Sequence, residues 1–197
     1  MIRTILASLL LSVSLVASSK TKLLQHIPLE WRPTSDLRLG TAQMTASPVT
    51  IATFTDGRDN KEVIGENRED DDPKPVTTSD DVSAFVSTHI RQLFNQAGIK
   101  TVDGNAGVTI HGEVKRFFVR EGGTYKSEVA IHLTVLDQSG KTLWNGLASG
   151  EATRFGRSYK AENYYEVLSD AVVNTVSSML QAAEFQKAIS GHASGES

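Results

Sequence analysis

The sequence predicts an α+β fold, a two-layer sandwich in which an antiparallel sheet of about four strands carries two amphipathic helices on one face. Two segments repeat apolar residues at spacings of three and four, which is typical of helices with one buried stripe. Three consecutive segments alternate apolar and polar residues, as strands with one buried face do. The expected order is β-α-β-β-β-α, and packing both helices on the apolar sheet face buries every apolar stripe.

Residues 1–19 are predicted to form a secretory signal. Arg3 supplies the positive start, an apolar run follows at 5–17, and small residues come next. The run is shorter than the roughly 20 apolar residues that span a bilayer, and an uncleaved membrane anchor is the alternative. Residues 20–47 contain scattered prolines without a sustained period, so we expect an extended N-terminal arm. The protein is therefore expected to be periplasmic or secreted.

The single domain is predicted at 48–187 and begins with a β-rich strand at 49–54. The next stretch, 56–78, has almost no apolar content and is predicted to be a long surface loop. It includes an acidic block at 69–72, which is either a solvated surface or a contact for a basic partner.

The first helix is predicted at 79–97, with capping side chains at its start and Gly98 just past its end. The second is predicted at 163–186, where Asn163 and Glu166 resemble a capping box. Few apolar residues follow, and 188–197 is predicted to be a disordered tail.

Three strands are predicted at 108–119, 125–136 and 142–153, joined by two short hairpin turns. The outer side of this sheet mixes polar and aromatic residues. It is solvated, covered by the N-terminal arm, or a partner site. The apolar side of the first strand is predicted to carry Val108, Ile110, Val114 and Phe118.

Composition excludes several classes of function. The formal net charge of −3 leaves no electrostatic footprint for nucleic acid. The chain has no cysteine, which excludes disulfides, thiolate metal sites and a thioether-linked acyl anchor on these residues. No phosphate-binding glycine loop, serine-hydrolase elbow or zinc-protease motif is present. We therefore expect no enzymatic activity and no cofactor.

His111 and His132 are the weak candidates for a metal site. Both fall on the polar phase of adjacent predicted strands, so they are candidate cross-strand neighbours. Zinc requires a third ligand and orienting partners, for which Glu113 and Glu128 are available. The alternative is two surface histidines on a solvated sheet, and no metal site is predicted.

The segment after the first strand holds the candidate binding residues, which are Asp56, Arg58, Asn60, Gly65 and Glu66. A calcium loop of the EF-hand type does not fit, because Arg58 occupies a ligand position and Lys61 the glycine position. The structural alternative is an ion pair between Asp56 and Arg58 that only pins the loop.

The same segment resembles the YajG-like family of bacterial envelope lipoproteins. In that family a hydrophobic strand runs into F-x-D-x-R and then I-G, here Phe54, Asp56, Arg58, Ile64 and Gly65. Later pieces agree in kind, including D-x-x-G-K-x-L-W at 137–144 and Y-x-x-L-S-D-A-V at 165–172. The resemblance covers about residues 48–185 and implies an envelope location and a fold rather than a mechanism. This chain departs from the family in lacking a cysteine after the signal.

We therefore expect a non-enzymatic exported cell-envelope protein, an accessory or scaffold domain that binds another envelope protein. The expected surfaces are the loop at 56–72 and the outer sheet face. Membrane contact is expected only indirectly or through an uncleaved signal. The first alternative is a periplasmic module that binds a small ligand or a metal through His111 and His132. The second is an exported hydrolase, since catalytic triads assemble in space.

Overall fold

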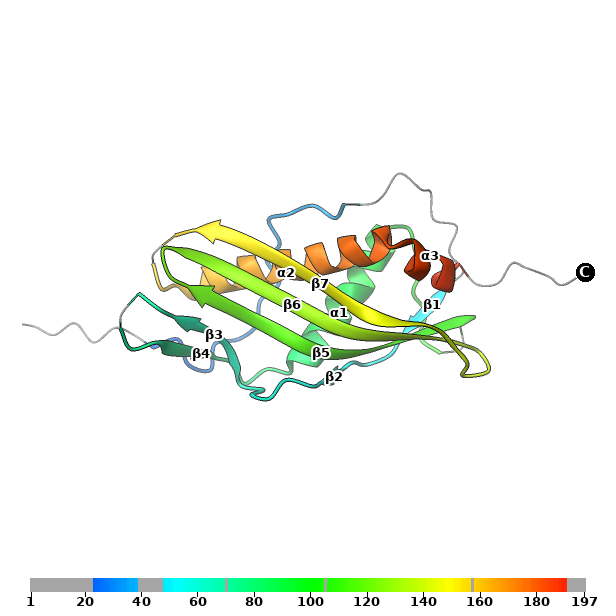
Figure 1. Ribbon diagram of the computed structural model, residues 1–197, viewed down its shortest axis with the longest axis horizontal. Coiled ribbons are helices and arrows are strands. Elements are labelled where there is room, and N and C mark those ends of the chain that lie inside the picture. The colour runs from blue at the N-terminus through cyan, green and yellow to red at the C-terminus, as the bar shows by residue number, and fades with distance from the viewer. Residues whose placement is uncertain (1–22, 39–47, 70, 105, 157, 191–197) are drawn as a thin grey trace, which may run out of the picture.

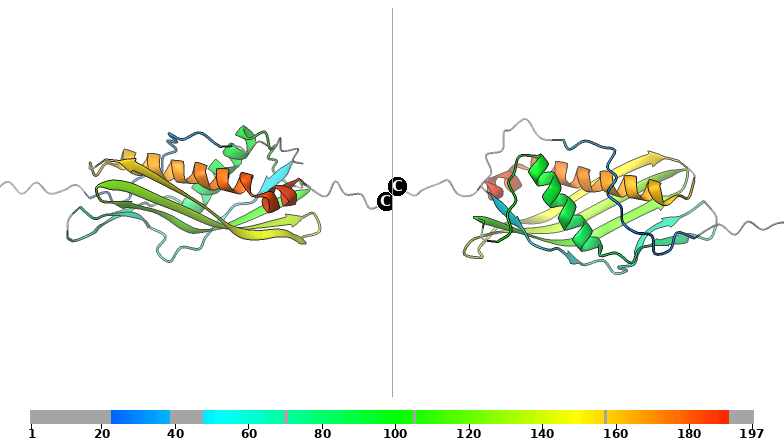
Figure 2. Two further views of the ribbon diagram at one scale, coloured as in Figure 1. Left: turned by 45° about the horizontal axis from the view of Figure 1, so that its top comes forward. Right: turned by 180° about the vertical axis from the view of Figure 1, so that it is seen from behind.

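The computed structural model describes residues 23–38, 48–69, 71–104, 106–156 and 158–190. These residues form two layers, a twisted sheet and a layer of helices on one of its faces (Figures 1 and 2). The strands are β1 (Val49–Ile51), β2 (Thr55–Asp56), β3 (Val63–Asn67), β4 (Lys74–Thr77), β5 (Val108–Glu121), β6 (Thr124–Asp137) and β7 (Thr142–Phe155). The helices are α1 (Val82–Gln96), α2 (Ala161–Gln181) and α3 (Ala183–Ile189).

The α+β class is confirmed, but the predicted four-stranded antiparallel sheet is wrong. The long strands β5, β6 and β7 form an antiparallel meander, as expected. On the other side of β5, however, β1, β2 and β3 pair in parallel with successive parts of that strand. β4 then pairs antiparallel with β3 and forms the edge of a mixed, seven-stranded sheet.

The stretch predicted as a long loop, 56–78, therefore contains β3 and β4. Each of these short strands contributes few apolar side chains, among them the fully buried Ile64 and Val76. Parallel strands need a long crossover, and α1 supplies it between β4 and β5. Parallel pairing leaves no local sequence pattern in strands this short, which is why this stretch was predicted to be a loop.

The first predicted helix is confirmed as α1, but it begins at Val82 rather than at residue 79. The Asp81 side chain accepts a hydrogen bond from the Ala84 amide at 3.0 Å, and Gly98 adopts a φ of 81° just beyond the helix. The capping box predicted at Asn163 is wrong, because α2 begins after Lys160 without a side-chain cap.

The second predicted helix is divided in two, because Ala182 has an extended conformation between α2 and α3. Ala188 and Ile189, which the sequence placed in the tail, belong to α3 and are buried. The remaining tail residues from 191 onward, like the predicted signal at 1–19, lie outside the described residues. Among the described residues, no helix is long and apolar enough to cross a membrane.

A β-bulge in β5 reverses which side chains are buried. The pairing with β6 shifts register between Val114 and Arg116, so Lys115 is an extra residue. Beyond it, Phe117 and Val119 are buried, and the side predicted for Phe118 is wrong. One inserted residue is enough to exchange the two faces of a strand.

The arm residues 23–38 cross the helix side of the molecule without forming a helix or strand (Figure 2, right). Their backbone is bound by side chains of α2. The amides of Thr34 and Ser35 donate to Asp170 Oδ1 at 2.6 and 2.7 Å, and the amide of Arg32 donates to Ser169 Oγ at 3.0 Å. The arm therefore covers α2, and these residues leave the outer face of the sheet open.

Trp31 fixes the middle of the arm onto α1. Its ring stacks on His89 with centroids 4.1 Å apart, and the edge of Phe85 closes the cluster. Burial lowers the pKa of His89, and the hydrogen bond with Gln92, which acts in the opposite direction, does not compensate. In the folded protein, where Trp31 of the arm stacks on His89, the neutral form of the His89 imidazole is therefore favoured.

We expect His89 to make the protein less stable in mild acid. Its folded pKa is depressed, so the unfolded chain binds more protons between that pKa and the ordinary value of about 6.5. The free energy of unfolding should be unaffected by this group above about pH 6.5 and should fall as the pH drops through that interval. Urea unfolding followed by the fluorescence of the two tryptophans, Trp31 and Trp144, measures this. His89→Gln should reduce the slope, and a slope equal to that of the wild type would contradict the assignment.

Candidate functional site

The loop between β2 and β3 is organised around a buried ion pair. Arg58 is only 9% exposed, and its Nε and Nη2 atoms donate to the two carboxylate oxygens of Asp56 at 3.0 and 2.8 Å. The same guanidinium donates to the carbonyls of Val63 and Lys61 at 3.1 and 2.6 Å. Four hydrogen bonds therefore hold the loop in one conformation.

The electrostatics of Asp56 fit this arrangement. Burial alone would raise the pKa of Asp56, but the hydrogen bonds from the Arg58 side chain and amide, together with its charge, leave the pKa below its usual value. The carboxylate is therefore ionised whenever the loop is folded near neutral pH. The sequence left open whether Asp56 and Arg58 bind a partner or only hold the loop in place. This geometry favours the second role.

The other three candidate residues face in different directions. Asn60 is exposed at the tip of the loop, where its side-chain oxygen accepts the amides of Glu62 and Val63. Gly65 packs inward, because a Cβ there would lie 2.8 Å from the ring of Tyr164. Glu66 lies in β3 and forms ion pairs with two arginines of the outer face. The structure thus brings together Asp56, Arg58 and Asn60, but not Gly65 or Glu66.

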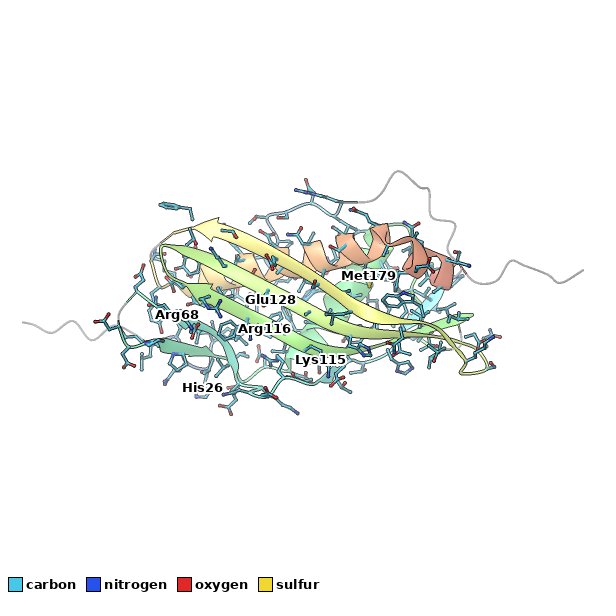
Figure 3. All side chains as sticks on the ribbon, viewed as in Figure 1. His26, Arg68, Lys115, Arg116, Glu128 and Met179 are labelled. Carbon is cyan, nitrogen blue, oxygen red and sulfur yellow. The ribbon has the colours of Figure 1, made fainter. Side chains whose placement is uncertain are left out.

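The outer face, the side of β5–β6–β7 away from the helices, carries rows of charged side chains. Figure 3 shows Arg116 and Glu128 on this face, and Arg68 at its margin. Glu66 bridges Arg68 at 2.6 Å and Arg120 at 3.0 Å. The cross-strand rows are Arg120–Lys126–Thr153, Phe118–Glu128–Glu151 and Arg116–Ala130–Ser149.

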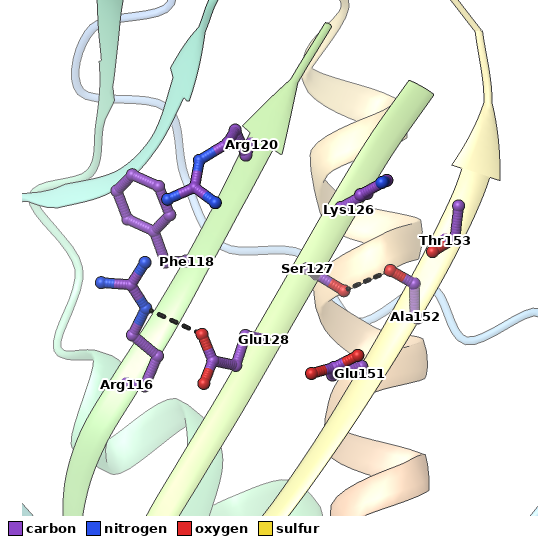
Figure 4. Close-up of a pocket in the computed structure, with 9 residues that line it drawn as sticks. All are labelled: Arg116, Phe118, Arg120, Lys126, Ser127, Glu128, Glu151, Ala152 and Thr153. Atoms are coloured by element: carbon purple, nitrogen blue, oxygen red, sulfur yellow. Dashed lines mark hydrogen bonds and ion pairs between the residues drawn. The ribbon is translucent and has the colours of Figure 1, made fainter. Parts of the chain in front are cut away.

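Two shallow hollows share one wall on this face. The wall is Phe118 with the Arg116 guanidinium stacked over its ring, 4.3 Å from the centroid, and Arg116 also pairs with Glu128 at 3.3 Å (Figure 4). The first hollow, of about 180 Å³, extends toward β7, where Glu151 and Thr153 line it. The second, of about 220 Å³, extends toward the loop, where its lining includes Arg58, Asp59, Asn60, Val63 and Lys115.

The two candidate metal ligands are not direct neighbours. His111 lies opposite Thr134, and His132 lies opposite Glu113 and contacts Asn145 Oδ1 at 2.9 Å. His111 lines a separate hollow of about 440 Å³, which His132 does not line. Within the part of the chain that the structure describes, no three His, Cys, Asp or Glu side chains are grouped to hold a metal ion.

A buried carboxylate escaped the sequence analysis. Glu121, predicted to begin a hairpin turn, is fully buried at the end of β5. Tyr164 donates its hydroxyl to Glu121 Oε2 at 2.8 Å, and the amide of Tyr159 donates to Oε1 at 3.0 Å. Burial and the Glu121 carboxylate raise the pKa of Tyr164, so this phenol stays protonated as a donor. Once the bulge in β5 is known, the inward position of Glu121 can be derived, because every second residue after the bulge is buried, first Phe117, then Val119 and then Glu121.

These features define a two-layer α+β domain in which arm residues 23–38 cross the helix side and leave the outer face of the sheet open. The sequence model of a family described as uncharacterized lipoprotein matches residues 40–190. The chain therefore belongs to this family, and the resemblance to the YajG-like lipoproteins is confirmed. Family membership identifies it as an envelope-associated protein. No protein with curated annotation matches the sequence.

Several solved structures are similar to this chain to different degrees. A protein from Xanthomonas campestris superposes with a TM-score of 0.57 at 9% identity, covering 79% of this chain and 94% of that one. The PelC dodecamer from Paraburkholderia phytofirmans gives 0.44 at 16% identity, covering 74% of this chain and 94% of that chain. A lipoprotein from Neisseria meningitidis gives 0.32 at 14% identity, with 66% and 97% covered. The first likeness supports the fold alone, because so little sequence is shared.

Proposed function

We propose that this protein is a non-enzymatic accessory or scaffold domain of the periplasm that binds another envelope protein through its outer sheet face. The observation that carries the proposal is the ridge formed by Arg116 and Phe118 between two hollows, on a face that arm residues 23–38 leave open. Arginine and aromatic side chains are the residues most often found at the centres of protein interfaces.

The size of the two hollows favours a protein partner over a small molecule. At about 180 and 220 Å³ they are smaller than typical small-ligand sites of roughly 300–1,000 Å³. They are open and shallow, and each accepts one or two side chains of a partner. Leu147, 62% exposed on the same face, extends the surface with an apolar contact.

The charges on the ridge suggest how a partner is oriented. Arg116 and Glu128 are 40% and 50% exposed, so their mutual attraction is weak and either charge is available to a partner. Charged groups at the rim of an interface act mainly on association rate and specificity, whereas the central aromatic residue supplies affinity. Phe118 is accordingly the residue whose loss should weaken binding most.

Affinity purification of the tagged protein from crosslinked envelope fractions, followed by mass spectrometry, tests this proposal. We expect a reproducible envelope protein whose recovery falls about tenfold or more when Arg116→Glu and Phe118→Ala are combined. Lys187→Glu, on α3 and away from the face, is the matched control and should leave recovery unchanged. Equal recovery with the ridge variant and the wild type would exclude this face, and recovery of no partner would overturn the proposal.

A further inference from the structure

The two edges of the sheet are protected to very different degrees. At one edge, β4 has only four residues, two of them Lys74 and Pro75. The arm also closes this edge, because Ile27 donates its amide to the Thr77 carbonyl at 2.9 Å and Leu24 accepts from the Thr77 amide at 3.0 Å. Short length, lysine, proline and a covering segment are the devices that prevent edge strands from pairing with other chains.

The opposite edge, β7, lacks the short length, the lysine, the proline and the covering arm of β4, and one side chain of α2, Asn174, contacts it. It is 14 residues long, contains no proline or lysine, and pairs with β6 along nearly all of its length. No strand among the described residues pairs with its other side, and β7 (yellow in Figure 1) ends the sheet. A long, unprotected edge is a template for another strand.

One hydrogen bond shows which backbone groups of β7 point outward. Asn174 of α2 donates to the Glu151 carbonyl at 2.7 Å, so this carbonyl points away from β6. In an antiparallel ladder, alternate residues direct both their N–H and C=O groups to the same side. The outward set beyond the bulge near Trp144 is therefore every second residue, namely Asn145, Leu147, Ser149, Glu151, Thr153 and Phe155.

The side chains of this same set project onto the outer face and include two large exposed hydrophobic residues. Leu147 is 62% exposed and Phe155 is 86% exposed, and they lie symmetrically four residues before and after Glu151. If two copies of β7 pair antiparallel about Glu151, Leu147 of each copy lies directly opposite Phe155 of the other. Ser149 then lies opposite Thr153, and every paired residue offers outward N–H and C=O groups.

We propose that β7 is a self-association edge, which pairs antiparallel with β7 of a second copy of this chain in the register centred on Glu151. Each directly opposed pair in this register exchanges two backbone hydrogen bonds, and two apolar cross-strand pairs shield Leu147 and Phe155 from water. The Glu151 carbonyl has a second lone pair, so the bond from Asn174 does not prevent pairing. The result is one continuous sheet across a two-fold axis.

This register contains one unfavourable pair, and its removal provides a test of the register. Glu151 lies opposite its own copy, and like charges directly opposed on a sheet are destabilising. Glu151→Gln removes this repulsion and should tighten the dimer by about two- to fivefold. Phe155→Ser should instead weaken it by about tenfold or more, because an apolar pair is lost on each side of the axis.

The absence of cysteine allows a direct test of the register by disulfide trapping. Ser149→Cys and Thr153→Cys proteins are purified separately, then oxidised alone and as an equal mixture. Opposed residues have Cα atoms about 5.5 Å apart, within the range a disulfide bridges. We expect the mixed dimer to exceed either same-variant dimer by about tenfold, whereas random collision makes it only about twice as abundant.

Sedimentation velocity across a range of concentrations tests the association itself. We expect Glu151→Gln to strengthen it and Phe155→Ser to weaken it. Leu23→Ser, at an exposed apolar residue of the arm, is the control and should leave it unchanged. A protein that stays monomeric at all concentrations, even with Glu151→Gln, would overturn the proposal, as would mixed disulfides at the random ratio. Capture of a different protein along β7 in place of a second copy would also overturn it.

Discussion

Replacing Arg58 with alanine is expected to destabilise the protein by about 3–5 kcal/mol. The substitution removes four hydrogen bonds and leaves the carboxylate of Asp56, only 13% exposed, without its counter-charge. It also leaves the carbonyls of Lys61 and Val63 without a donor. A buried charge that has lost its partner costs far more than the pair contributed, which is why the expected effect is large.

Urea unfolding of four variants separates the loss of the buried ion pair from the loss of a surface arginine. They are Arg58→Ala, Asp56→Ala, the double variant of these two, and Arg68→Ala. Arg68→Ala is the matched control, because Arg68 is 51% exposed and its ion pair with Glu66 is worth about 0–1 kcal/mol. Asp56→Ala should approach the cost of Arg58→Ala, and the double variant should cost clearly less than the sum. If Arg58→Ala lowered the free energy of unfolding no more than Arg68→Ala does, the structural role of the Asp56–Arg58 pair would be refuted.

The same pair predicts the direction of one pH effect. Because the folded pKa of Asp56 lies below its usual value, its stabilising contribution is fully present above about pH 4 and is lost as the pH falls through the folded pKa. The Asp56→Asn variant should lack this part of the acid dependence. An unchanged acid profile would show that Asp56 does not gain its stability from ionisation.

The elements that could be predicted from the sequence are those specified by neighbouring residues. α1 has a capping aspartate, a regular apolar stripe and a terminal glycine, all within one short segment. On β6, buried and less buried residues alternate from Ile131 to Val135. In both cases the periodicity of the local backbone determines which side chains face the core, and no distant contact changes it.

What could not be predicted depends on contacts that are distant in sequence. The strand predicted at 49–54 is present as β1, but β2 and β3 form because β5 offers them a long edge, and neither has an extended pattern of its own. The bulge at Lys115 exchanges the faces of Phe117 and Phe118 and places Glu121 in the core. A single inserted residue is invisible in the alternation until its partner strand is known.

In the candidate site, too, the features set by neighbouring residues could be predicted and those set by distant contacts could not. Asp56 and Arg58 were identified as a pair from their spacing, and the loop carbonyls that complete the pin became visible only in the fold. Ser169 and Asp170 were predicted simply as part of the second helix. Their partner is the backbone of the arm, more than 130 residues earlier in the chain.

The second large effect is expected at Gly150, where α2 lies directly on β7. Gly150 is buried, and a Cβ at this position would lie 2.5 Å from the Ala171 carbonyl oxygen, 2.7 Å from the Asn174 carbonyl carbon and closer still to the Thr175 amide. All three are backbone atoms of α2, which cannot rotate away as a side chain does. Gly150→Ala therefore forces the helix and the sheet apart.

We expect Gly150→Ala to lower the free energy of unfolding by about 1–3 kcal/mol or more, as overpacking of a close-packed core does. The matched control is Gly107→Ala, because a Cβ there has no heavy atom within 4 Å and should be neutral or slightly stabilising. Denaturant unfolding of the two variants under identical conditions gives the comparison. Equal stabilities of the two variants would mean that α2 can move away from β7 without a loss of stability. The buried residues of α2 would then not determine the distance between this helix and the sheet. A large difference would identify Gly150 as the residue that permits the close approach, and with it the placement of Asn174 beside the β7 edge.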